Sequence, residues 1–269
     1  MAKIVEEHDR RVALQTGGPG QLIGWANRFG DSRTKIVQQL ISMYSRTNSL
    51  VLTSAFVDFS RWLGIAPDDW AEPSSLTDQI AVAAALTRAW ACGSPDGSGT
   101  IRKALVSYYA PFDPARAVLP GSDGDPISLL DAALAKGEII GVKLYPPMGF
   151  RATANSDPSL QFPALIDDHP MAGAALDAAL DRMYRVCLKH DAPLMSHCGD
   201  SNYTDPAYGK RAGPQYWLSL INTKPYRNLR VNLGHFGSIW AFWEINSSDK
   251  DTAEKQKRLG AGRLAFRGL

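Results

Sequence analysis

The chain has 269 residues, enough for one large α/β domain or two small ones, and its 45% hydrophobic content is sufficient for a sizeable core. Its 29 Lys and Arg residues and 27 Asp and Glu residues give a net charge of +2 that is spread along the chain, so we expect neither nucleic acid nor an acidic surface as a partner. Three scattered cysteines are too few for a disulfide framework or a CxxC metal site, which favours a reducing, cytoplasmic setting.

The hydropathy pattern indicates neither a signal peptide nor a membrane-spanning segment. The first ten residues carry charges where a signal peptide needs an apolar core. No later run approaches the ~18 apolar residues of a membrane span. We therefore expect a soluble protein without a membrane partner.

Composition divides the chain into three parts. Residues 1–30 are poorly defined, because an Arg pair and the Gly-rich turn cluster at 17–20 interrupt any pattern. Residues 31–246 read as one α/β domain, and 247–269 as a polar C-terminal segment.

Within the central part, apolar periodicity predicts alternating helices and strands. The expected strands are 50–57, 104–110, 138–145, 192–196 and 229–233. The expected helices lie between 31 and 49, between 74 and 90, near 128–136, up to 190 and near 217–221. The segment 148–170 has no clear period and is expected to be an extended loop over the strand ends.

Two histidines follow strands in this pattern. His197 comes directly after the strand at 192–196, and His235 after the strand at 229–233. Alternation of strand and helix predicts a parallel sheet, because parallel neighbours need a crossover connection. Both imidazoles are therefore expected at carboxyl ends of strands, where α/β folds place their ligand sites.

An ordered set of motifs in the chain resembles the amidohydrolase-related family (the amidohydrolase 2 group) of metal-dependent hydrolases. The motifs are VDF at 57–59, YAPFDP at 109–114, GVKLYPPMG at 141–149, PLMSHCG at 193–199 and LRVNLGHFG at 229–237. The resemblance covers roughly residues 35–240. It implies a (β/α)8 TIM-type barrel in which the five expected strands are the second to the sixth.

The resemblance also implies a divalent metal, Zn²⁺ or another divalent ion, with His197 as a ligand and His235 as a ligand or a catalytic partner beside it. The family's first-strand His-x-His or Glu-x-His is absent, and no apolar strand carries a late Asp. The chain thus resembles a partial barrel of five or six β/α units, without the first and last strands. Two imidazoles alone would bind metal weakly, and open strand edges would favour association into a homo-oligomer.

Other polar residues lie at the expected strand ends. Lys143 is within an apolar strand and must reach an end of the barrel or a carboxylate, which favours a substrate-facing or structural role over the metal-bridging lysine of some amidohydrolases. Asp58, Asp113 and Asp200 could contact substrate or orient a ligand histidine, or only cap turns, and Asp58 ranks first as a catalytic residue. Arg151 could bind a substrate carboxylate through its guanidinium fork, or be a solvated loop residue.

The remaining candidate residues are not expected to take part in catalysis or metal binding. Cys198 and His197 are neighbours on an extended segment, so their side chains point to opposite faces and do not form a nucleophilic dyad. His8, His169 and His190 lie in charged, loop or helix-edge segments and are expected at the surface. The seven tryptophans are dispersed, which favours core positions over a binding platform.

Three functions remain open at this point. The first is a metal-dependent hydrolase of a small cyclic amide, lactone or ester. The second is a non-oxidative decarboxylase of an aromatic or unsaturated acid, since the same family includes such lyases on the same scaffold. The third is an inactive partial barrel that binds no metal.

Overall fold

The structure is a computed structural model, and it describes residues 32–44, 49–64, 75–90, 94–95, 101–119, 123–166, 171–199 and 206–237. The terminal segments expected at 1–30 and 247–269 lie outside the described residues. So do His8, His169 and Asp200.

The chain divides into two compact units. The smaller unit comprises Met1–Leu52 and Arg88–Val106, and the larger comprises Thr53–Thr87 and Ser107–Leu269. In the smaller unit, helix α3 (Arg33–Met43) begins after Ser32, whose side chain accepts a hydrogen bond of 3.2 Å from the Lys35 backbone N–H. Ser32 is therefore the N-cap of this helix, which begins within the range expected from the sequence.

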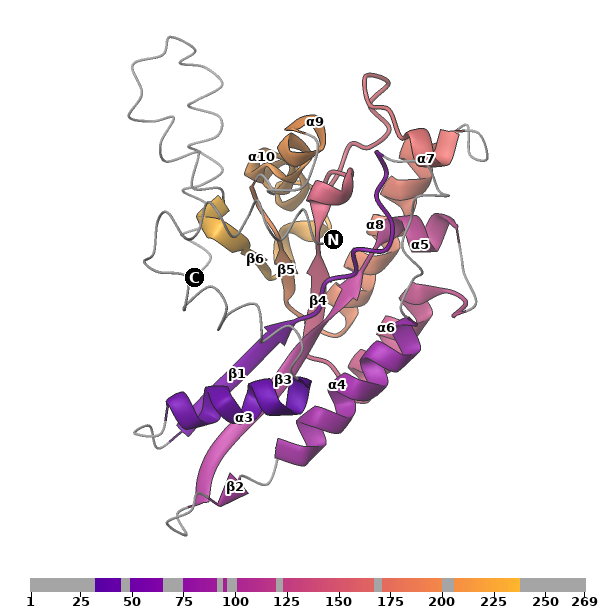
Figure 1. The fold of residues 1–269 in the computed structure, drawn as a ribbon. Coiled ribbons are helices and arrows are strands. Elements are labelled where there is room, and N and C mark those ends of the chain that lie inside the picture. Colours follow the sequence, from indigo (N-terminus) through magenta and orange to yellow (C-terminus); the bar gives the residue numbers. More distant parts are fainter. Residues whose placement is uncertain are drawn as a thin grey trace, which may run out of the picture. The chain divides into compact units, whose positions relative to one another are not determined.

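The remaining elements alternate along the chain (Figure 1). The strands are β1 (Ser49–Ala55), β2 (Ser94–Pro95), β3 (Ile101–Phe112), β4 (Gly141–Leu144), β5 (Leu194–Ser196) and β6 (Val231–Leu233). The α-helices are α4 (Leu76–Trp90), α5 (Pro114–Val118), α6 (Pro126–Ala135), α7 (Pro163–Ile166), α8 (Ala172–Lys189), α9 (Pro206–Gly209) and α10 (Pro214–Ile221). Short 3₁₀ helices are η3 (Pro146–Met148), η4 (Lys210–Ala212), η5 (Tyr226–Asn228) and η6 (Gly234–Gly237).

The strands form a curled parallel sheet in the order β1-β3-β4-β5-β6, to which the short β2 adds an antiparallel pairing with β3. In the larger unit this sheet has the form of a half-barrel. Residue Lys143 of β4 stands opposite Met195 of β5, and Leu144 stands opposite Ser196. The predicted α/β class and the parallel arrangement are confirmed.

The two faces of the sheet differ in what they carry. Val142 and Leu144 of β4, with Leu194 of β5, are fully buried in the hydrophobic core. Helices α4, α6, α8 and α10 contribute the other side of that core, and α6 and α8 pack against each other (Figure 1). Since side chains alternate along a strand, Lys143 and Met195 belong to the opposite, inner face of the half-barrel.

Some helical segments were not predicted. Helix α5 begins immediately after β3, in a segment where the sequence pattern predicts no helix. Asp113 is its N-cap, accepting from the Ala115 N–H at 2.9 Å, and Pro114 occupies the first turn, where a missing N–H costs nothing. Within 148–170, which was predicted to be a loop, α7 forms a single helical turn.

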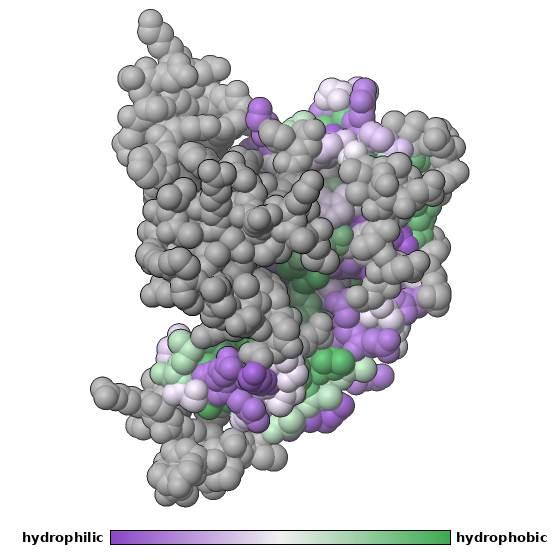
Figure 2. Space-filling model, in the orientation of Figure 1, coloured by the Kyte–Doolittle hydropathy of each residue, from purple (hydrophilic) through white to green (hydrophobic). Residues whose placement is uncertain are grey.

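The described surface is mixed in polarity. Hydrophilic and hydrophobic residues are interspersed on the face drawn in Figure 2. Large apolar side chains such as Met171 and Val82 are exposed singly, which is ordinary for a folded domain. Across the described ranges, no helix combines the length and the apolar character needed to cross a lipid bilayer.

Candidate functional site

The structure brings His197 and His235 together at the carboxyl ends of the neighbouring strands β5 and β6. Nε2 of His235 lies 3.2 Å from Nδ1 of His197, and the two ring centroids are 4.4 Å apart. His197 follows β5 directly, and its backbone N–H donates to the Leu144 carbonyl at 3.0 Å. This bond extends the β4-β5 pairing by one step and fixes the start of the loop that carries the imidazole.

His235 is held differently. It lies in η6, which begins at the residue after β6, and its backbone has φ of 55°, in the left-handed region that non-glycine residues seldom occupy. His235 is exposed, whereas His197 retains only 9% of its accessible surface. The pair thus has one protected member and one member open to solvent.

Aromatic side chains lie beside His197. The ring of Tyr145 is 4.6 Å from the His197 ring, and Phe59 meets Tyr145 edge-on at 5.0 Å. Trp62 stacks on Phe59 at 6.1 Å. We call Phe59, Trp62 and Tyr145 the aromatic wall. Sequence reasoning missed it, although Tyr145 is the last residue of the expected strand 138–145 and Phe59 lies two residues after the expected strand 50–57.

Lys143 lies on β4, on the inner face that also carries Tyr145. The residue is 9% exposed, and within the described part of the chain its ammonium group has no hydrogen bond or ion pair. Burial lowers the pKa of Lys143 from 10.5 to about 8. The sequence predicts that this lysine reaches either an end of the barrel or a carboxylate, and no pairing with a carboxylate is found among the described residues.

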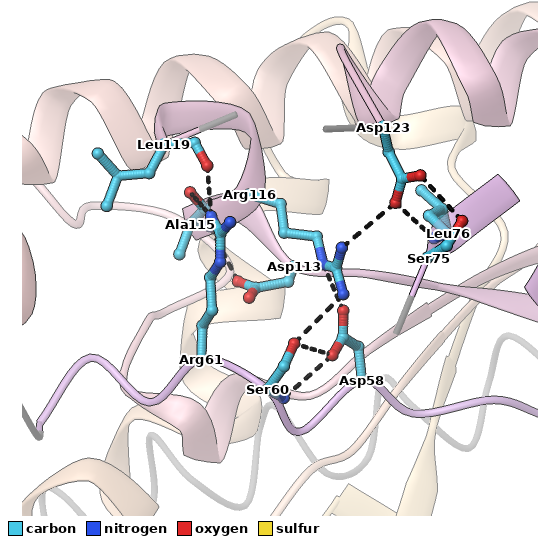
Figure 3. Close-up of polar contacts among 10 residues, drawn as sticks. All are labelled: Asp58, Ser60, Arg61, Ser75, Leu76, Asp113, Ala115, Arg116, Leu119 and Asp123. Atoms are coloured by element: carbon cyan, nitrogen blue, oxygen red, sulfur yellow. Dashed lines mark hydrogen bonds and ion pairs between the residues drawn. The ribbon is translucent and has the colours of Figure 1, made fainter. Parts of the chain in front are cut away.

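Asp58 is engaged in a buried ion pair rather than with the imidazoles. Its Oδ2 accepts from Nε of Arg116 at 2.5 Å, and its Oδ1 accepts from the backbone N–H of Ser60 at 3.0 Å and from the Ser60 hydroxyl (Figure 3). Both carboxylate oxygens are therefore occupied by partners from its own unit. These contacts make Asp58 a residue that positions the segment after β1.

Asp113 and Arg61 complete this polar cluster. Arg61 donates to the backbone carbonyls of Ala115 and Leu119, so it satisfies the C-terminal end of α5 (Figure 3). Burial and, to a smaller extent, the nearby Asp58 carboxylate together raise the pKa of Asp113 to about 7, against the lowering effect of the Ala115 N–H. Oδ2 of Asp113 is buried and has no hydrogen-bond partner in the described chain.

A third carboxylate joins the cluster to α4. Asp123 accepts from the Leu76 backbone N–H at 2.7 Å and from the Ser75 hydroxyl at 2.9 Å, and lies 3.6 Å from Arg116 (Figure 3). Such a carboxylate stabilises the helix N-terminus. The cluster therefore connects the segment after β1, helix α5 and the N-terminus of α4, which favours a structural role.

Arg151 is held in its loop by three partners. Its Nη1 pairs with Asp157 at 3.0 Å, and its guanidinium lies 4.6 Å from the centre of the Tyr216 ring. Its backbone N–H donates to Asn155 at 2.7 Å. The carboxylate that the guanidinium binds in the structure is thus Asp157, and a substrate carboxylate would have to replace it.

Cys198 and His190 are two of the residues that were not expected to take part in the site. Cys198 is buried, and burial raises its pKa to about 12, so its thiol stays protonated and is a poor nucleophile. His190, expected at the surface, is partly buried, and its Nε2 lies 2.5 Å from Asp131. The contact between His190 and Asp131 ties the C-terminal end of α8 to α6.

The distance between the two histidine nitrogens is compatible with a shared divalent metal ion. Two imidazole nitrogens that each lie ~2.05 Å from a tetrahedral Zn²⁺ are about 3.3 Å apart, close to the observed 3.2 Å. The neutral nitrogen donors are of the type that Zn²⁺ prefers. Among the described residues, no group of three His, Cys, Asp or Glu side chains surrounds a common point, so the pair fits as two ligands and water would complete the shell.

Comparison with protein-family models, with curated proteins and with solved structures finds no match. The resemblance to the amidohydrolase-related family therefore rests on the sequence motifs.

Proposed function

We propose that the chain is a metal-dependent hydrolase of the amidohydrolase type, acting on a small cyclic amide, lactone or ester. The observation that carries the proposal is the separation of 3.2 Å between ring nitrogens of His197 and His235 at the ends of adjacent parallel strands. Carboxyl ends of parallel strands are where α/β folds assemble their sites. A TIM-type barrel arrangement, of which the half-barrel would be a part, belongs to the same proposal.

Each residue of the site has a distinct role in this proposal. His197 and His235 would hold a divalent ion, which polarises a carbonyl or lowers the pKa of bound water towards ~7. His235 is exposed and is the imidazole that can exchange a proton with a water molecule or a leaving group. The aromatic wall supplies an apolar surface beside His197 for the body of the substrate.

The test is the metal content of the purified chain at equilibrium with Zn²⁺, measured by elemental analysis after equilibrium dialysis. His197→Ala and His235→Ala each remove one ligand, while His190→Ala removes a histidine that is paired with Asp131 outside the site. We expect about one bound ion per chain, held weakly and saturable, in the unaltered protein and in His190→Ala, and loss of that ion in the other two variants. A content that is the same in all four proteins, or zero in all four, contradicts the proposal and favours an inactive partial barrel.

The aromatic wall favours a second candidate, a non-oxidative decarboxylase of an aromatic or unsaturated acid. Planar substrates stack against such rings, and Tyr145 lies only 4.6 Å from His197. Substrate screening separates the two activities: a decarboxylase releases CO₂ without consuming water, whereas a hydrolase consumes one water molecule for each bond cleaved.

A further inference from the structure

Lys143 lies at the middle of β4 on the inner face of the half-barrel. It stands opposite Pro111 of β3 and Met195 of β5, while its neighbours Val142 and Leu144 point into the core. The alternation of side chains along parallel strands places Tyr145 and His197 on the same face as Lys143. With ~3.3 Å per residue and ~4.8 Å between strands, the Cα atoms of Lys143 and His197 are about 8 Å apart.

The surroundings of this lysine do not stabilise its charge. Lys143 is more than nine-tenths buried, and no described residue accepts a hydrogen bond from it. The buried carboxylates Asp58 and Asp113 face Arg116 and Arg61, and neither contacts Lys143. An ammonium group that is largely withdrawn from water and has no partner is costly, and this burial lowers the pKa of Lys143 to about 8. A substantial fraction of the group is then the neutral amine near pH 8, which is the nucleophilic form.

We propose that Lys143 is a carbonyl-reactive amine that forms a Schiff base with a small aldehyde or 2-oxo acid entering the inner face of the half-barrel beside His197. This inference goes beyond the proposed hydrolase, and it does not depend on a bound metal. A lysine that only supported the structure would gain by pairing with a carboxylate, and Lys143 has no such partner among the described residues.

The reaction balances without a further co-reactant. The neutral Nζ forms a bond to the carbonyl carbon while the C=O π electrons move to oxygen, and a proton passes from nitrogen to oxygen to give a carbinolamine. The oxygen then takes up a proton from solvent and leaves as water, while the nitrogen lone pair forms the C=N bond. The sum is amine, carbonyl compound and one proton giving an iminium ion and water.

The experiment traps this iminium on the full chain. The protein is incubated with glyoxylate and sodium cyanoborohydride, which reduces the iminium to a stable N-carboxymethyl group. Tryptic digestion and mass spectrometry then locate the modification. Trypsin does not cleave after a modified Lys143, so the adduct is found on the peptide 137–151.

We expect Lys143 to be modified at least tenfold faster at pH 7 than the exposed Lys136 and Lys210, because its pKa of about 8 leaves more neutral amine than a lysine ordinarily has. Its rate should level off above about pH 8, whereas that of a free lysine derivative such as Nα-acetyl-lysine, with a pKa of ~10.4, continues to increase. Modification of Lys143 no faster than of Lys136, or no modification of Lys143 while Lys136 reacts, would falsify the inference.

Two comparisons make the result specific. Lys143→Met, a swap of similar length, should remove the fast-reacting site, and Lys136→Met should leave it unchanged. If Lys143→Met does not fold, the rates at each lysine and their pH dependence in the unaltered chain are sufficient to test the proposal. Repeating the cyanoborohydride experiment after treatment with a chelator separates the two proposals. Fast modification of Lys143 in a metal-free chain supports the Schiff-base proposal, whereas the hydrolase proposal is tested by the metal analysis described above.

Discussion

Asp113 shows how the charge of a single residue depends on distant parts of the chain. Its side chain caps α5 through the Ala115 N–H, yet its second oxygen is buried without a partner and it lies near the carboxylate of Asp58. The two arginines of the cluster, Arg61 and Arg116, are committed to backbone carbonyls and to Asp58. The protonated form of Asp113 is therefore favoured in the folded chain.

Asp113 predicts an unusual pH dependence of stability. Burial raises its pKa in the folded state from 3.8 to about 7, so between these values the folded chain binds a proton that the unfolded chain does not. The free energy of unfolding should then fall as the pH rises from about 4 to about 7, by up to about 4 kcal/mol. Asp113→Asn keeps an oxygen to cap α5 and cannot ionise, so its stability should depend less steeply on pH.

Urea unfolding of both proteins at a series of pH values measures this effect. The difference in unfolding free energy between Asp113→Asn and the unaltered chain should grow in favour of the variant up to about pH 7 and then stay level. A difference that is constant over the whole range would show that Asp113 ionises normally in the folded state.

Among the elements, α8 is the helix that most clearly ties the sheet to its outer layer. Leu176, Leu180 and Met183 recur on one face of the helix and are all buried, which is typical of an amphipathic helix that packs on a core. The C-terminal end of the helix is tied to α6 by the contact between His190 and Asp131. Helix α8 thus holds the outer face of β4 and β5, whose inner face carries Lys143.

Shortening a buried side chain of α8 should destabilise the chain strongly. Leu176 has no exposed surface, so Leu176→Ala removes apolar burial and leaves a cavity, with an expected cost of about 2–5 kcal/mol. The control is Arg185→Ala on the exposed side of the same helix, which breaks only an ion pair with Asp181 and should cost less than about 0.5 kcal/mol. Equal losses in the two variants, measured by urea unfolding, would mean that α8 does not pack as described.

At the scale of the whole molecule, the described sheet is a half-barrel that ends at β1 and β6. The expectation that open strand edges favour association stays a prediction. The candidate metal site lies at the β5-β6 end of the sheet, and an ion held by His197 and His235 would join these two strands. Binding of that ion, if the proposal holds, would be coupled to folding.

This coupling predicts that Zn²⁺ raises the stability of the folded chain. A ligand at one hundred times its Kd adds about 2.7 kcal/mol when it binds only the folded state. We expect the Tm of the unaltered chain and of His190→Ala to rise with added Zn²⁺ and to fall again with a chelator. The rise should be absent in His197→Ala, and an equal rise in that variant would place the zinc elsewhere.

Local patterns were sufficient to predict the strand and helix order and the residues that follow each strand. Apolar residues at periods of two or about 3.6 decide which segments form strands and helices, so His197 and His235 could be assigned to strand ends from the sequence. The same local reasoning missed α5, because a proline after a strand indicates both the end of pairing and the first turn of a helix.

The sequence by itself determined the α/β class, the parallel order and the positions of the two histidines, because each depends on neighbours within a few residues. Only the tertiary structure decided which polar groups meet. Asp58 pairs with Arg116 across 58 positions, Tyr145 lies against His197, and Lys143 has no partner in the described chain. These outcomes depend on which segments the sheet brings side by side, and no local period carries that information.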